Sequence, residues 1–333
     1  MLRVAMLSKW HVHAEDYAKQ LQALDDVKIT AVWDEEAERG AEWAKELGAD
    51  FEADLDTLLK RADVDAVAVN TPTNLHTEVM VAAANSGKHI FTEKVMALTV
   101  KECQDIAEAV KKAGVKFCIS FPHRTHPHNL FAKKVAEEKF IGDITLLRVR
   151  NAHNGAIANW LPDFFYDPVL CGGGAMMDLG AHPMYLSRWI LGKPMRITSI
   201  FNSYTGRAVE DNAVSVIEYE NKAVAIVETG FVTAASPFTL EMYGTEGSLL
   251  VGGPDNKVRL LSNRINSPVH GWITPSQLPK ALPSAIRQWV KGITEGTEIC
   301  FGLEEGIQLT ELMEGAYKSH RENRQVDFSE LNI

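Results

Sequence analysis

A glycine-rich run near the middle of the chain ends in an acid and a base that are suited to proton transfer. Gly172–Gly174 are followed by Asp178 and His182, which stand four residues apart. This spacing places both side chains on one face if a helix starts near Met176. The three glycines let the backbone approach a ligand closely, and a carboxylate beside an imidazole forms a pair that can transfer a proton. The run is therefore a candidate active-site segment.

A second marker, Thr92-Glu93-Lys94, lies far upstream at the end of an apolar segment. Together the two markers resemble the Gfo/Idh/MocA oxidoreductases, the family of glucose–fructose oxidoreductase and inositol dehydrogenase. The resemblance spans nearly the whole chain, with two departures: the usual Glu-Lys-Pro reads Glu93-Lys94-Val95, and the glycine-rich phosphate loop is absent. Its further pieces, in chain order, are Asn70-Thr71-Pro72 with His76, Ser86-Gly87-Lys88-His89, Gly142-Asp143-Ile144 and Gly244-Thr245-Glu246-Gly247.

Composition narrows the class of protein. The 333 residues predict two domains with enough material for a buried core, and a formal net charge of −10 argues against a nucleic-acid binder. No apolar run reaches membrane-spanning length, and the N-terminal apolar segment is too short for a signal peptide. The four cysteines are scattered, without zinc-type pairing. We expect a cytoplasmic protein that binds neither nucleic acid nor membranes.

The first part of the chain alternates apolar strands with amphipathic helices. Strands separated by helices predict right-handed βαβ units and a parallel sheet, which is the doubly wound Rossmann architecture of dinucleotide-binding domains. We expect strands at 4–7, 27–33, 66–69, 90–92 and 115–120, and helices at 14–24, 35–47, 54–61, 76–86 and 100–113.

Beyond Phe121-Pro122 the pattern changes to strands joined by turns, which predict an antiparallel sheet. We therefore expect an α/β protein with an NAD-binding Rossmann domain over 1–121 and an α+β substrate-binding and oligomerisation domain over 122–333, whose open sheet is largely antiparallel. The open face often forms subunit contacts in the family, so the resemblance implies a homodimer or homotetramer. Residues 262–285 lack periodicity and are expected to form a loop over the active site or at a subunit contact. The expected elements are helices at 123–139, 172–191 and 304–320, and strands at 144–153, 196–204, 212–219, 223–231, 238–243, 249–251 and 258–261.

The segment between the first strand and the first helix lacks the G-x-G-x-x-G turn of dinucleotide sites. In that motif the glycines make a tight turn and let the pyrophosphate approach the backbone and the helix N-terminus. Ser8, Trp10 and His13 occupy the glycine positions here, and Lys9 and His11 are left to supply charge or donors. Two interpretations stay open: a phosphate loop rebuilt from side chains, which we favour, or a loop that no longer binds a dinucleotide.

Asp34 ends the second expected strand, where a ribose-binding carboxylate belongs. It would accept hydrogen bonds from both adenosine ribose hydroxyls and repel a 2′-phosphate, and Glu35-Glu36 would strengthen the repulsion. Because no arginine follows immediately, NAD is expected to be preferred over NADP. A helix N-cap aspartate would occupy the same position.

The resemblance assigns cofactor contacts to two further segments. Asn70-Thr71-Pro72 would lie against the ribose on the nicotinamide side, with His76 starting the next helix. Glu93 would contact the same ribose. Lys94 would lie between nicotinamide and substrate.

The resemblance also implies the catalytic roles. Lys94 would hydrogen-bond the substrate hydroxyl that becomes a carbonyl and stabilise a developing alkoxide. His182, whose ordinary pKa is about 6.5, would accept the hydroxyl proton. Asp178 would orient the substrate or the imidazole.

Other polar residues are expected to line the substrate pocket. Arg124 matches a position where the family often carries arginine, and His153 ends a strand that points at substrate in the family. Trp160 either stacks on a sugar ring or packs in the core. No metal is expected, because the histidines around Arg124 lack the spacing of a tetrahedral site; they are His123, His126 and His128.

We thus expect an NAD-dependent oxidoreductase that transfers a hydride between nicotinamide and a secondary hydroxyl of a sugar, inositol or related polyol. Two alternatives stay open: a glycoside-cleaving enzyme that oxidises its substrate transiently with NAD, and a non-catalytic sensor of a sugar or dinucleotide. The missing glycines favour the sensor, whereas Lys94, Asp178 and His182 argue against it.

Overall fold

The computed structural model describes residues 1–265 and 271–331, in two compact units. The first unit comprises Met1–Phe121 and Pro283–Thr310, and the second comprises Pro122–Leu282 and Glu311–Ile333. The division made from the sequence placed every residue after 121 in the second domain, whereas Pro283–Thr310 groups with the first unit.

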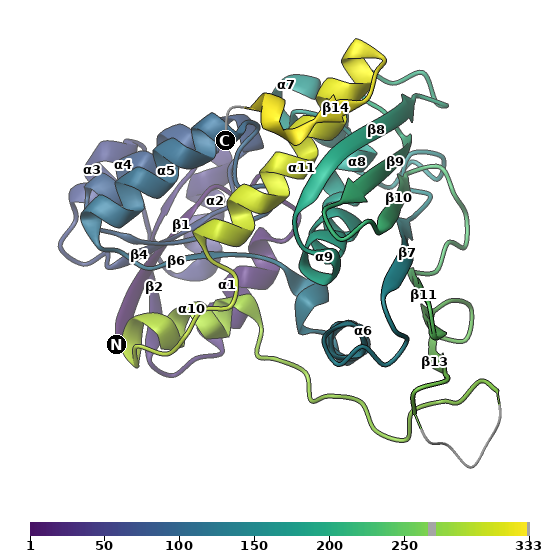
Figure 1. The fold of residues 1–333 in the computed structure, drawn as a ribbon. Coiled ribbons are helices and arrows are strands. Elements are labelled where there is room, and N and C mark those ends of the chain that lie inside the picture. The colour runs from purple at the N-terminus through teal and green to yellow at the C-terminus, as the bar shows by residue number, and fades with distance from the viewer. Residues whose placement is uncertain (266–270, 332–333) are drawn as a thin grey trace. The chain divides into compact units, whose positions relative to one another are not determined.

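The first unit is built on a parallel sheet of six strands in the order β3-β2-β1-β4-β5-β6 (Figure 1). The strand interiors are apolar on both faces, as in a sheet covered on both sides. The order reverses between β1 and β4, and ligands bind at such a switch point, beyond the carboxyl ends of the strands. The predicted doubly wound sheet is confirmed. The strands are β1 (Leu2–Leu7), β2 (Val27–Trp33), β3 (Asp50–Phe51), β4 (Ala66–Val69), β5 (His89–Thr92) and β6 (Phe117–Ile119).

Capping residues mark the ends of helices in the first unit, as α5 shows. Helix α5 begins with a capping box between Thr99 and Glu102 and ends at Gly114, whose φ of 68° is left-handed. Helix α10, which the sequence did not predict, packs on the sheet: the Cys118 thiol donates to the Ala285 carbonyl at 3.5 Å. The helices are α1 (Ala14–Gln22), α2 (Ala37–Leu47), α3 (Leu55–Lys60), η1 (Thr73–Leu75), α4 (His76–Asn85), α5 (Val100–Ala113), α10 (Ala285–Thr294) and the start of α11 (Leu303–Glu322).

The second unit contains an eight-stranded sheet in the order β13-β12-β11-β7-β10-β9-β8-β14 (Figure 1). All neighbours are antiparallel except β7 and β10, which confirms the largely antiparallel sheet. Strand β9 alternates strictly, so Ile217 faces inward while Val214 and Val216 are exposed. The strands are β7 (Ile144–Ala152), β8 (Pro194–Asn202), β9 (Asn212–Tyr219), β10 (Val224–Gly230), β11 (Thr239–Gly244), β12 (Gly247–Gly252), β13 (Lys257–Ser262) and β14 (Val326–Asp327).

The prediction of one helix over 172–191 is wrong, because the segment forms two helices, α8 and α9. Pro183 has no N–H to donate to the carbonyl four residues earlier, and the His182 amide instead donates to the Leu179 carbonyl at 3.2 Å. Helix α9 packs against β7 and β10. The helices of this unit are η2 (Pro122–Thr125), α6 (Pro127–Glu137), η3 (Asp163–Tyr166), α7 (Pro168–Cys171), α8 (Ala175–Asp178), α9 (Ala181–Leu191), η4 (Phe328–Leu331) and the remainder of α11.

Part of the loop expected at 262–285 lies outside the described residues, namely 266–270. In its described part, Ile273 forms an isolated bridge with Leu260. None of the helices described is both long and apolar enough to cross a membrane.

Candidate active site

The loop after β1 makes its tight turn without glycine. Ser8 has a φ of 71°, the left-handed conformation that the first glycine of a phosphate loop would supply. Trp10, at the second glycine position, is buried. The turn of the phosphate loop is thus retained with side chains in place of glycines.

The backbone amides of this loop are hydrogen-bonded within the protein. The Lys9 amide donates to Asp34 Oδ2 at 2.8 Å, and the Trp10 amide donates to Ser8 Oγ at 3.0 Å. The His11 amide donates to the Asn70 carbonyl at 3.1 Å. In a glycine-rich loop such amides point at the pyrophosphate. This loop therefore differs from a phosphate loop in its donors as well as its sequence.

Lys9, which was expected to supply charge to the cofactor, is held by carboxylates. Its Nζ lies 3.0 Å from Glu46 and 3.2 Å from Glu15, and it sits 5.9 Å from the centre of the Trp43 ring. Its ammonium group therefore forms ion pairs with carboxylates of helices α1 and α2 in this structure.

Asp34 is buried and has a partner that the sequence analysis missed. Arg39 donates to Asp34 Oδ1 at 2.6 Å and to Asp34 Oδ2 at 3.0 Å, and it also pairs with Glu35 at 2.7 Å. Burial raises the pKa of Glu35, and the Arg39 charge opposes that rise. The signal was present, because Glu35 and Arg39 stand at the i,i+4 spacing of helical ion pairs.

The turn after β4 is fastened to the segment that carries Lys94. His76 is fully buried, with Nε2 3.2 Å from the Thr71 carbonyl and Nδ1 2.9 Å from the Val95 carbonyl. Burial lowers the pKa of His76, and the hydrogen bonds to the surrounding carbonyls oppose that shift. Asn70 and Pro72 are buried in the same turn. His76 therefore holds two loops of the candidate site together.

Glu93 is the centre of a buried polar cluster at the end of β5. Its carboxylate, 2% exposed, accepts hydrogen bonds from the Tyr17 hydroxyl and the Lys94 amide and lies 2.8 Å from His13 Nδ1. Burial alone would raise the pKa of Glu93, but the charges of His11, His13 and Lys94 outweigh it and hold that pKa well below its ordinary value. The peptide bond between Lys94 and Val95 is cis.

In the second unit, the glycine run is held by a carboxylate that sequence reasoning missed. Glu210 accepts hydrogen bonds from the Gly174 amide at 3.0 Å, from the Met176 amide at 2.9 Å and from the Tyr317 hydroxyl at 2.6 Å. A Cβ at Gly173 would lie 1.9 Å from the Tyr317 oxygen. The glycines thus allow the backbone to approach Tyr317 and Glu210.

His182 is buried on α9, with its Nδ1 2.9 Å from the Tyr185 hydroxyl and its ring 4.6 Å from that of His123. The Tyr185 oxygen also accepts a hydrogen bond from the His123 amide at 3.1 Å. Burial lowers the pKa of His153, and the negative charge of Asp178 partly opposes that shift. Asp178 thus acts electrostatically on His153.

The remaining predicted pocket residues have different surroundings. Trp160 is exposed, with its ring centre 4.6 Å from that of His153. The Arg124 guanidinium lies over the Trp189 ring at 4.9 Å, so it stacks on an aromatic neighbour. His126 is exposed, and desolvation lowers its pKa.

Comparison with known proteins gives two family matches. Residues 10–121 match the GFO/IDH/MocA model described as "Oxidoreductase family, NAD-binding Rossmann fold", and residues 130–250 match the family's C-terminal domain. A scyllo-inositol 2-dehydrogenase (NAD(+)) of Bacillus subtilis (strain 168) is 30% identical over 252 residues, 71% of this chain and 70% of that protein. This chain belongs to the GFO/IDH/MocA oxidoreductase family.

Other relatives of this GFO/IDH/MocA protein cover the chain more fully at lower identity. Inositol 2-dehydrogenase of Rhizobium meliloti (strain 1021) is 23% identical over 323 residues, 94% of this chain and 95% of that protein. The solved structure of a levoglucosan dehydrogenase in complex with NADH and L-sorbose superposes with a TM-score of 0.86 at 21% identity, covering 100% of both chains. The structural likeness at this identity establishes a shared fold.

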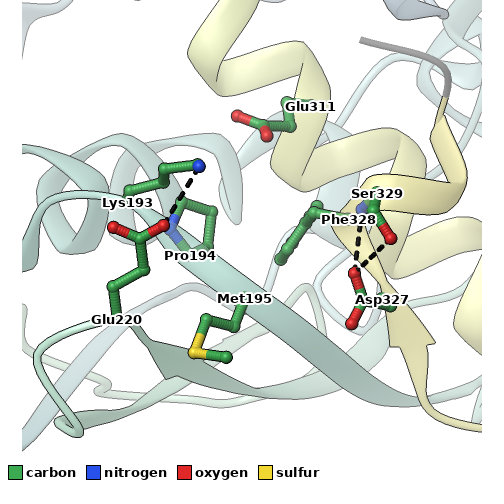
Figure 2. Close-up of a pocket in the computed structure, with 8 residues that line it drawn as sticks. All are labelled: Lys193, Pro194, Met195, Glu220, Glu311, Asp327, Phe328 and Ser329. Atoms are coloured by element: carbon green, nitrogen blue, oxygen red, sulfur yellow. Dashed lines mark hydrogen bonds and ion pairs between the residues drawn. The ribbon is translucent and has the colours of Figure 1, made fainter.

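None of the predicted site residues lines a separate cavity of about 370 Å³ in this GFO/IDH/MocA protein (Figure 2). Glu311 of α11 and Phe328 line it together with Lys193, whose Nζ lies 3.0 Å from Glu220. Burial raises the pKa of Glu311, and the Arg188 charge opposes that rise. The cavity is distinct from the glycine run and from the predicted catalytic residues.

Proposed function

We propose that this protein is an NAD-dependent dehydrogenase that oxidises a secondary hydroxyl of a sugar, an inositol or a related polyol. The observation that carries the proposal is Lys94, a lysine only 6% exposed, two residues after the β5 strand of a dinucleotide-type sheet. A buried lysine at that edge is suited to act on bound ligand. The relatives named as inositol and levoglucosan dehydrogenases support the class of substrate.

The cofactor would accept the hydride, which is chemistry that the protein itself does not supply. The chain offers the switch point between β1 and β4, the Asn70–Pro72 turn and Glu93 as the residues that would hold a dinucleotide. Asp34 would accept hydrogen bonds from the adenosine ribose, and its negative charge supports NAD over NADP. Arg39, which neutralises that charge at 2.6 Å, reduces the expected preference.

Lys94 and His182 would divide the work on the hydroxyl group. The Lys94 ammonium would stabilise negative charge on the oxygen as the hydride departs. His182 can accept a proton at Nε2 if Nδ1 carries its hydrogen toward the Tyr185 oxygen, 2.9 Å away. The same oxygen accepts a hydrogen bond from the His123 amide at 3.1 Å.

One observation favours a second candidate, a sensor of sugar or dinucleotide without turnover. The amides of the loop after β1 are bonded to Asp34, Ser8 and Asn70, so a pyrophosphate finds fewer ready donors than in a glycine loop. A calorimetric titration of cofactor-stripped protein with NAD, NADH and NADP tests this point. Absence of binding by all three would favour the sensor.

Turnover is tested by screening sugars and inositols for NADH formation, with Lys94→Ala as the matched variant. We expect activity in the wild type, none in the variant, and NAD binding in both. Equal activity in the two proteins would refute the assigned role of Lys94. NAD binding without net NADH formation would direct the search to glycoside cleavage.

The open face of the second sheet supports a homo-oligomer. Ile200 on β8 and Val214 on β9 are paired neighbours, and both are exposed along with Val216. An apolar surface on one face of a sheet is typical of a protein–protein contact. We propose that a second copy of the chain covers this face, as subunits do in the family.

A further inference from the structure

Three side chains of metal-ligand type converge in the first unit. His11, His13 and Glu93 each offer one ligand atom, and these atoms all lie within 4.8 Å of one another. The two rings have their centres 4.9 Å apart, and His13 Nδ1 is 2.8 Å from Glu93 Oε1. The proposed dehydrogenase assigns Glu93 to the dinucleotide, so a different ligand of this cluster would bind the cofactor-free protein.

The fold accounts for the convergence. His11 and His13 lie on the loop that follows β1, and Glu93 directly follows β5. Both strands run in the same direction in one sheet, so their carboxyl ends share an edge. The His11 amide donates to the Asn70 carbonyl after β4, the strand between them, which brings the loop across toward Glu93.

The set has the features of a built site. Glu93 is buried, and the Tyr17 hydroxyl that donates to it is 2.7 Å from Ser120 Oγ. Ligating carboxylates are commonly held by such outer hydrogen bonds, which fix their orientation. The side chain of His13 is 48% exposed, so an ion can enter from the solvent side.

We propose that His11, His13 and Glu93 bind a divalent transition-metal ion, with Zn²⁺ the best match. Two imidazoles and one carboxylate suit zinc, whose bonds of about 2.1 Å place ligand atoms roughly 3.4 Å apart in a tetrahedron. To reach that value, the 2.8 Å between His13 Nδ1 and Glu93 Oε1 has to open, and any ligand pair near the 4.8 Å limit has to close. The ion would take the place of the hydrogen between His13 and Glu93. Mg²⁺ and Ca²⁺ are disfavoured because they prefer oxygen ligands. Three protein ligands leave one position for water or a substrate oxygen.

Lys94 distinguishes this site from the proposed dehydrogenase chemistry. Its positive charge acts on Glu93 and therefore repels a bound cation. Lys94→Met should remove turnover and leave zinc binding unchanged or tighter. The two proposals thus predict different outcomes for one variant, and the failure of either is visible without the other.

The test is a calorimetric titration of untagged, chelator-treated and cofactor-free protein with Zn²⁺, repeated with Mg²⁺ and followed by visible spectroscopy with Co²⁺. We expect one Zn²⁺ per chain, no Mg²⁺ binding, and a Co²⁺ spectrum of low coordination number. His13→Ala should weaken Zn²⁺ binding at least about 10-fold, and Tyr17→Phe should weaken it about 10–100-fold as an outer-shell change. Because half-exposed His13 is tolerant of substitution, loss of binding in His13→Ala cannot be ascribed to unfolding once circular dichroism is unchanged.

His128→Ala is the matched control, since His128 is a partly buried histidine in the other histidine cluster. It should bind Zn²⁺ as the wild type does. Wild-type protein that binds no Zn²⁺, equal affinity in the wild type and His13→Ala, or loss of binding in His128→Ala instead, would each overturn the proposal.

Discussion

The Tyr317→Phe substitution tests whether Glu210 holds the glycine run in place. Tyr317 donates to Glu210 at 2.6 Å, and the same carboxylate receives the amides of Gly174 and Met176. Burial raises the pKa of Glu210, and the bond from Tyr317 opposes that rise. Removing the hydroxyl therefore leaves a buried carboxylate with fewer donors, at the start of the segment that carries Asp178.

The magnitude follows from the loss of one hydrogen bond to a charged group, which contributes about 1.5–3 kcal/mol. For a domain of this size, about 2 kcal/mol lowers the melting temperature by about 4–8 °C. Displacement of Asp178 and His182 should also reduce kcat by at least about 10-fold, since misplacement of about 1 Å can cost 100-fold. NAD affinity should not change, because the altered residue belongs to the second unit.

The assay combines thermal unfolding, NAD titration and turnover for Tyr317→Phe beside Tyr243→Phe. Tyr243 also donates to a glutamate, Glu241, at 2.8 Å, but it lies in a partly exposed position. We expect the control to retain both its melting temperature and its kcat much more closely. A Tyr317→Phe protein as stable and as active as the wild type would refute the assigned role of Glu210.

Three further predictions concern the cofactor, the base and the oligomer. His182→Asn should lower kcat and abolish the acidic limb of its pH profile; an unchanged profile would remove His182 as the base. Asp34→Ala should raise affinity for NADP about 10-fold, because it removes a negative charge that repels a 2′-phosphate and takes one of the three carboxylate partners from Arg39, and Asp34→Ala/Arg39→Ala should reduce the gain in a titration. Val216→Lys, at a position 40% exposed, should convert the proposed oligomer to monomers in light scattering while circular dichroism stays the same; an unchanged mass would refute an interface on this face.

Most of the fold was predictable because its elements carry strong local patterns. The strand at Val27–Trp33 and the helix at Val100–Ala113 have the predicted bounds, since an apolar strand segment and the spacing of a capping box are visible in short windows of sequence. Helix α10 was missed because the segment before it is rich in proline and serine and hides its start. The break between α8 and α9 was missed because the prediction relied on apolar periodicity, which continues through the segment. It did not take account of Pro183, which has no N–H for the helical hydrogen bond.

The site was only partly predictable for a different reason. The glycine run and Lys94 were identified from short motifs, but the partners that hold them lie far away in sequence. Glu210 and Tyr317 are 107 positions apart, and Tyr17 and Glu93 are 76 positions apart. No local spacing encodes such pairs, because they form only when the sheet brings distant segments together. Arg39 is the exception, since its pairing with Glu35 follows helical spacing.

The internal hydrogen bonds of the loop after β1 should lower the affinity for NAD by a measurable amount. If a pyrophosphate displaces the internal bonds of the Lys9, Trp10 and His11 amides, each contributes about 1 kcal/mol, and the sum of about 3 kcal/mol weakens NAD roughly 100-fold relative to a glycine loop. Ser8→Gly isolates one of these bonds. Ser8 already has a φ of 71°, so a glycine fits the backbone conformation at this position. Loss of the serine hydroxyl removes the acceptor of the Trp10 amide.

Ser8→Gly should therefore bind NAD about 5-fold more tightly than the wild type, as about 1 kcal/mol predicts. Ser8→Ala is the matched control, because it removes the same hydroxyl but is strained at a left-handed φ. Weaker NAD binding by both variants would mean that the hydroxyl itself contacts the phosphate. The Ser8 hydroxyl would then replace the glycine-loop amides as the donor to the phosphate. That result would refute the idea that internally bonded amides weaken NAD binding.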